Sequence, residues 1–210
     1  LVIFPVLLGY EWLLMPADLD LLTAADWAVM LGLAGLAVAF VWRDRRHAVR
    51  LGLGARNFLP AARLLAAPTV LMAAASAAMG AWAGTPVRPA AAVLSVATYP
   101  LYAVIQLALF QLFLVPRLRR LSANRLHIVV AAAGIFALIH WPNPVVMAAT
   151  ALGGVVWTLV YLHRPNLYAL ALAMGIAAAV FAHALPDGVT HNMRTGPIYV
   201  LRLIERAGAS

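Results

Sequence analysis

The chain has 210 residues, of which 65% are hydrophobic and only 10% are charged, and its mean hydropathy is +0.92. This composition excludes a soluble globular domain, because too little polar surface would be left to face water. Cysteine is absent and all 15 basic residues are arginine, which excludes disulfides, thiolate metal sites, cysteine nucleophiles and a Schiff-base lysine. In a membrane chain the net charge of +8 is expected to meet anionic lipid headgroups, and nucleic acid is not expected as a partner.

Seven strongly apolar stretches approach or exceed the roughly 18 residues that a helix needs to cross the hydrocarbon core. The predicted spans are 1–15, 24–42, 58–83, 91–115, 125–140, 145–162 and 167–185. The predicted fold class is therefore all-α, a polytopic transmembrane helical bundle of about seven spans. An eighth span fits if further residues precede Leu1. The first and fifth stretches are short enough to be re-entrant, which would change the count.

Arginines gather in the loops after the second, fourth and sixth predicted spans. They are Arg43, Arg45, Arg46, Arg50 and Arg56, then Arg117, Arg119, Arg120 and Arg125, then Arg164. All three loops fall on one side if every span crosses once, and the positive-inside rule makes that side cytoplasmic. The all-arginine, alanine-rich composition favours a bacterial gene and hence the bacterial cytoplasmic (inner) membrane.

We expect one domain, a transmembrane bundle over 1–185 with a motif-bearing core at about 91–185. Residues 186–210 are expected to form a polar turn and a short tail. Within the tail, Ile198, Leu201 and Ile204 would share one face of a helix, with Arg202 and Glu205 on the other. Such an amphipathic helix would lie on the membrane surface, and the alternative is a frayed terminus.

Three stretches after residue 95 carry the remaining polar and aromatic signals. They read YPLYAVIQLALFQLFLVPRL, then FALIHWPNP, then NLYALALAMG. They resemble the CPBP family of intramembrane proteases, the CAAX prenyl endopeptidases and their bacteriocin-processing relatives. That family carries a Glu-Glu-x-x-x-Arg helix, a Phe-x-x-x-His helix and a His-x-x-x-Asn/Asp helix. At these positions this chain has Gln106, Leu107 and Gln111, then Phe136 and His140, then Met174 and Ala178.

The resemblance implies a CPBP-like bundle and, in an intact member, hydrolysis by an activated water that needs a base or a metal cation. Gln106 cannot ionise, Leu107 offers no base, and Gln111 supplies no positive charge to a developing oxyanion. Neither glutamate of the chain, Glu11 or Glu205, lies in a motif helix. We therefore expect a catalytically degenerate member that binds, scaffolds or assists other integral membrane subunits, with membrane lipids as further partners and no cofactor.

His140 is the best single candidate for a functional residue, because a histidine at membrane depth is functional by default. The alternative is that its imidazole hydrogen-bonds Gln106 or a freed carbonyl. One histidine is also a poor metal site, since zinc takes three or four protein ligands, so no metal is expected, and any metal would have His140 as its ligand. Gln106 and Gln111 either line a polar pocket or bond neighbouring helices.

Two other functions fit the sequence. One is an active, metal-dependent intramembrane endopeptidase with a rearranged site, using His140 with a displaced pair, His183 and Asp187. That pair is four residues apart, but Pro186 lies between them and is expected to end the helix. The other is a haem-ligating or pigment-ligating subunit, with His127 or His140 as the ligand.

Overall fold

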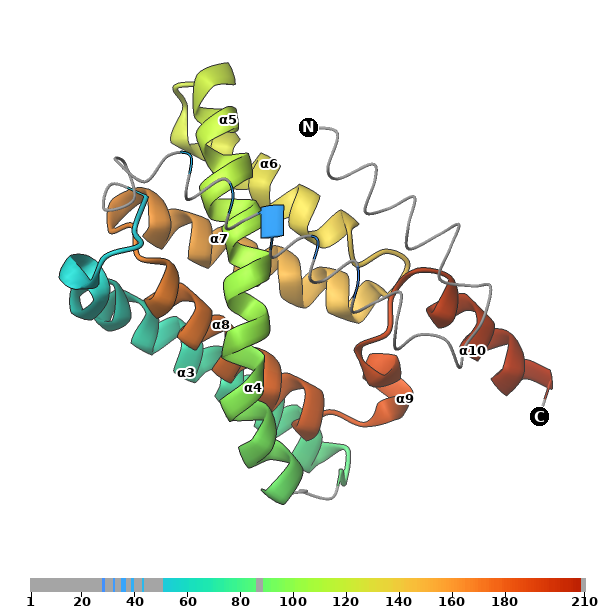
Figure 1. Ribbon diagram of the computed structural model, residues 1–210. Coiled ribbons are helices and arrows are strands. Elements are labelled where there is room, and N and C mark those ends of the chain that lie inside the picture. The colour runs from blue at the N-terminus through green and yellow to red at the C-terminus, as the bar shows by residue number, and fades with distance from the viewer. Residues whose placement is uncertain are drawn as a thin grey trace.

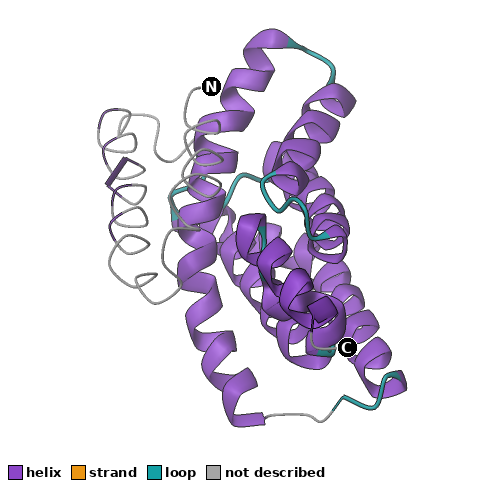
Figure 2. Ribbon diagram, turned by 90° about the vertical axis from the view of Figure 1, so that its right-hand side faces the viewer, coloured by secondary structure: helices purple, strands orange, loops and turns teal. Residues whose placement is uncertain are grey.

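The computed structural model describes residues 51–85 and 89–208, together with single residues between 28 and 43. The span expected at 1–15 lies outside these residues, as does most of the span expected at 24–42. Every regular element in the described part is helical and none is a strand (Figures 1 and 2). The all-α class is therefore confirmed.

The helices follow the order of the predicted apolar stretches. They are α3 (Phe58–Trp82), α4 (Pro89–Leu107), the π-helix η4 (Ala108–Leu114), α5 (Val115–Leu121), α6 (Arg125–Leu138), α7 (Pro144–His163), α8 (Leu167–Ala184), α9 (Asp187–Thr190) and α10 (Gly196–Gly208). Two short 3₁₀ turns, η3 (Ala55–Asn57) and η5 (His191–Met193), complete the described part.

Four helical segments of the described part are long and apolar enough to cross a membrane: 55–82, 93–121, 144–163 and 167–184. These segments confirm a multi-pass helical membrane bundle. The fifth predicted span corresponds to α6, which has only 14 residues. The total of seven spans stays a prediction.

Small residues set the closest helix contacts, as is usual where helices pack in lipid. Helix α8 packs against α3 and α4, and α6 packs against α7. A Cβ on Gly175 of α8 would lie 2.5 Å from the ring of Pro100 in α4, and one on Gly154 of α7 would lie 3.0 Å from the Cα of Ala133 in α6. The backbones can approach because these side chains are missing.

Helices α6, α7 and α8 each begin at an asparagine. The side chains of Asn124, Asn143 and Asn166 accept hydrogen bonds from backbone N–H groups in the first turn of their own helices. An asparagine N-cap satisfies one of the orphan donors of a helix start. The sequence thus fixes where these three helices begin.

The described parts of the three arginine-bearing loops lie together. The Arg125 side chain donates to the carbonyl of Leu162 at 3.1 Å, and the Asn166 amide donates to the carbonyl of Gly54 at 2.8 Å. We call residues 51–57, 117–125 and 162–166 the basic end. The turn between α6 and α7 lies at the other end of these helices, with α9 and α10 (Figure 1).

Candidate functional site

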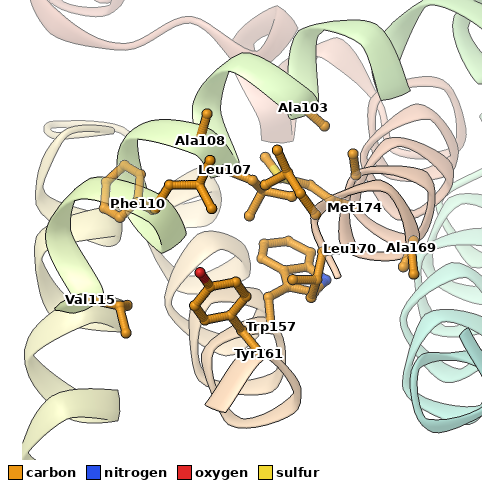
Figure 3. Packing of buried hydrophobic residues seen from close by; sticks show 14 of the residues in the cluster. Ala103, Leu107, Ala108, Phe110, Val115, Trp157, Tyr161, Ala169, Leu170 and Met174 are labelled. Carbon is orange, nitrogen blue, oxygen red and sulfur yellow. The ribbon is translucent and has the colours of Figure 1, made fainter. Parts of the chain in front are cut away.

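The three motif-like helices are α4, α6 and α8, which carry the three motif stretches of the sequence. One motif position on each of them has its side chain in a single apolar cluster. Leu107 at the end of α4 is 1% exposed, Phe136 of α6 is 2% exposed, and Met174 of α8 is 7% exposed. Figure 3 shows Leu107 and Met174 in the same group of side chains as Trp157 and Phe110. The three helices therefore converge in the core, and the side chains at the point of convergence are apolar.

Gln106 lies outside that point of convergence. Its side chain is half-buried, and its amide nitrogen donates to the Tyr102 hydroxyl of its own helix at 3.2 Å. In the described structure its amide therefore bonds its own helix rather than His140.

Gln111 points into the bundle. It is 2% exposed, and its Nε2 donates to Oγ1 of Thr158 on α7 at 3.3 Å. Its Oε1 is buried and has no hydrogen-bond partner in the part of the chain that the structure describes. A buried acceptor without a donor costs about 1–3 kcal/mol. The bond to Thr158 fits the expectation of a link between helices, which the sequence could not assign to a particular partner.

A π-helix lies between Gln106 and Val115 and contains the buried Gln111. Residues 108–114 form η4, and at its end the N–H of Val115 bonds the carbonyl of Phe110. This i→i+5 pattern widens the turn and rotates the residues that follow it. The sequence held no clear signal for it, and straight α-helical spacing places the two glutamines on different faces without fixing which one is buried.

His140 follows α6 at the turn to α7, where it is half-buried. Its Nδ1 is 2.7 Å from the carbonyl oxygen of Phe136, which has no α-helical donor because the N–H of His140 bonds Ala137 instead. The acceptor is a carbonyl, so Nδ1 carries the proton and Nε2 presents its lone pair. This is the bond to a freed carbonyl that we expected as the alternative to a functional role. It is also how proteins fix a histidine whose second nitrogen reacts or binds.

The candidate catalytic pair His183 and Asp187 lies on two different helices. His183 in the last turn of α8 has its Nε2 2.6 Å from Oγ of Ser95 on α4. Helix α8 ends at Ala184, as Pro186 predicts, and Asp187 opens α9 as an exposed residue. His183 and Asp187 share no hydrogen bond in the described structure. Ala178, at the last motif position, is half-buried on α8.

The described residues do not fit a divalent metal. Their His, Asp and Glu side chains form no group of three or more that could hold one. The only carboxylates in this part of the chain are Asp187 and Glu205. His127, a possible haem or pigment ligand, is exposed at the basic end with Nδ1 3.5 Å from Oγ of Ser122. Glu11 lies outside the described residues.

Asn143, three residues after His140, holds the turn against the C-terminal segment. It is fully buried, and its Nδ2 donates to the carbonyls of Thr190 at 2.8 Å and Arg194 at 2.9 Å. Beside it, the N–H of Gly196 donates to the carbonyl of Trp141 at 2.9 Å. We had not singled out Asn143, although an asparagine between two prolines was a visible signal of a structured turn.

The polar side chains at the described motif positions are thus the His140 imidazole and the neutral amides of Gln106 and Gln111. These groups can form hydrogen bonds with a ligand. They include no carboxylate that could take a proton from water.

These features define a multi-pass helical membrane protein whose three motif-like helices meet in the core. Residues 88–189 match the family described as Type II CAAX prenyl endopeptidase Rce1-like. The matched region contains all three motif-like helices, and over these residues the chain is similar to that family. No curated protein and no solved structure matches the chain.

Proposed function

We propose that this CAAX-protease-like membrane protein does not hydrolyse peptides and instead serves as a binding, scaffolding or accessory subunit of a membrane complex. The observation that carries the proposal is the apolar filling of the converged motif positions. Leu107 and Met174 stand where the family has a glutamate and a histidine, and both are buried in the hydrophobic core.

The chemistry supports this proposal. Water attacks a peptide carbonyl at a useful rate only when a base takes its proton or a cation lowers its pKa. His140 alone could serve as a base, but no described carboxylate orients it, and Gln111 provides no charge for the oxyanion.

Native mass spectrometry of the chain, extracted from its own membranes in mild detergent, tests the proposal. We expect a second integral membrane protein bound in a fixed ratio, with no peptidase activity in the complex. A chain that is isolated alone and cleaves a peptide would contradict it.

An active peptidase with a rearranged site is the second candidate. The orientation of His140 favours it, because a backbone carbonyl fixes Nδ1 and leaves Nε2 free to react. This candidate requires cleavage that falls at least tenfold in an Asp187→Asn variant and in a His183→Ala variant. Equal rates in the three proteins would eliminate the rearranged site.

We further propose that the basic end faces the cytoplasm of a bacterial cell. The absence of cysteine allows single cysteines to be introduced on a clean background. Ala123→Cys in the α5–α6 turn should be protected from an impermeant maleimide in intact cells, while Gly188→Cys at the opposite end should be labelled. The reverse pattern would overturn this orientation.

A further inference from the structure

Positive charge at the basic end is uncompensated within the described structure. Five arginines there are exposed: Arg56, Arg119, Arg120, Arg125 and Arg164. The two described carboxylates, Asp187 and Glu205, belong to the C-terminal segment at the opposite end. This surface therefore carries net positive charge among the described residues and attracts anions.

Hydrogen bonds bring arginines from three separate loops onto this surface. Arg125 at the start of α6 reaches the carbonyl of Leu162 at the end of α7, two residues before Arg164. Asn166 holds the carbonyl of Gly54, two residues before Arg56. The fold, rather than sequence proximity, gathers these cations.

The helix dipoles contribute little net charge at this end. Helices α3, α6 and α8 start there, while α5 and α7 end there, so partial positive and partial negative charges largely offset each other. The positive potential therefore comes from the arginine side chains.

Exposed leucines lie beside the arginines. Leu121 is 74% exposed and Leu126 is 66% exposed, on either side of the turn that leads to Arg125. Leu59, near Arg56, is 56% exposed. Cations next to bare apolar side chains match a ligand that has both an anionic head and a hydrocarbon tail, and this favours a phospholipid over a soluble anion.

We propose that the basic end is a binding surface for anionic phospholipids, with the phosphate held by the arginines and the acyl chains lying over the leucines. This assignment is independent of whether the bundle is a peptidase. It names a preferred lipid class and places it at one end of the molecule.

Binding of phosphatidylglycerol and of phosphatidylcholine to the purified protein in detergent tests the proposal. Wild type should prefer phosphatidylglycerol. The double variant Arg56→Gln/Arg164→Gln should bind it roughly 25-fold more weakly, since each arginine near a lipid surface contributes roughly fivefold. The matched control Arg194→Gln/Arg206→Gln removes the same charge at the other end and should change the affinity by less than about twofold.

Three results would overturn the proposal. They are equal affinity for the two lipids, equal losses in the two double variants, and saturation by inorganic phosphate at the concentrations at which phosphatidylglycerol saturates. The variant Arg56→Lys/Arg164→Lys guards against a folding defect. It keeps the charge and should retain most of the binding, so weak binding by this variant would also count against the proposal.

Discussion

Two kinds of buried amide side chain distinguish the ends of the bundle from its middle. Asn143 and Asn166, at opposite ends, use both amide atoms in hydrogen bonds of 2.8–3.2 Å to the backbone. Gln111, in the middle, makes one bond of 3.3 Å and leaves its oxygen without a partner in the described structure. The polar groups that hold the fold are satisfied, while the one at a motif position is not.

This difference indicates which of these residues stabilise the fold. The end asparagines cap helices and fasten chain segments that are far apart in sequence. Gln111 contributes little to the fold, because an orphan acceptor offsets a long hydrogen bond. A buried polar group with little structural benefit at a motif position suits the proposed role in binding.

Replacing Asn143 is predicted to have the largest effect on stability. Asn143→Ala would leave the carbonyls of Thr190 and Arg194 buried without their donor, at a cost of about 3 kcal/mol in the free energy of unfolding. Thermal or denaturant unfolding in detergent measures this change. The control is Asn124→Ala, which removes an exposed cap and should cost at most about 1 kcal/mol. Equal losses would mean that the Asn143 bonds do not fasten the C-terminal segment.

The next largest effect on stability is expected where α8 packs closely against α4. Gly175→Ala would push a methyl group into Pro100 on the neighbouring helix, and overpacking of this kind costs about 1–3 kcal/mol. In Gly134→Ala, where no heavy atom lies within 4 Å of the new Cβ, stability should be unchanged or slightly higher. Unfolding curves of the two variants compare the sites directly, and an equal response would contradict the close packing of α4 on α8.

A smaller effect of opposite sign is predicted at Gln111. Gln111→Leu removes both the long bond and the orphan oxygen, so stability should be unchanged or rise by up to about 1 kcal/mol. The same change at Asn166 should destabilise, because its amide bonds Gly54 and Ala169. If Gln111→Leu destabilises as much as Asn166→Leu, the contrast between the middle and the ends fails.

The smallest effect concerns pH at the C-terminal segment. Partial burial and the neighbouring Arg206 guanidinium, 3.3 Å from Nδ1, lower the pKa of His191 below its usual value of 6.5. The folded chain thus prefers the neutral ring. The stabilisation that His191 adds to the free energy of unfolding is complete above pH 6.5 and is lost as pH falls through the lower pKa of the folded state.

Melting temperatures at about pH 7.5 and pH 5 measure this contribution. Wild type should lose slightly more stability on acidification than His191→Gln, because only wild type carries the group with the lowered pKa. An equal loss would show that His191 does not couple to the stability of this segment.

The outline of the fold was accessible from the sequence because apolar length is a local signal. The resemblance placed Leu107, Phe136 and Met174 on three motif helices, and the structure shows that these positions share one apolar cluster. Gln106 bonds Tyr102 four residues earlier on its own helix, a spacing that the sequence shows. The bonds from Gln111 to Thr158 and from His183 to Ser95 join different helices, and they depend on the rotation of neighbouring helices, which hydropathy and spacing do not encode.

A single-turnover proteolysis assay tests most directly whether the apolar centre is catalytically silent. Excess purified protein in lipid is incubated for hours with a prenylated peptide ending in a CAAX sequence, and the mass of the peptide is measured by mass spectrometry. We predict an unchanged peptide mass, identical for wild type and His140→Ala. A cleavage product formed by wild type and absent with His140→Ala would prove that the imidazole works without a neighbouring carboxylate among the described helices, and would refute a silent centre.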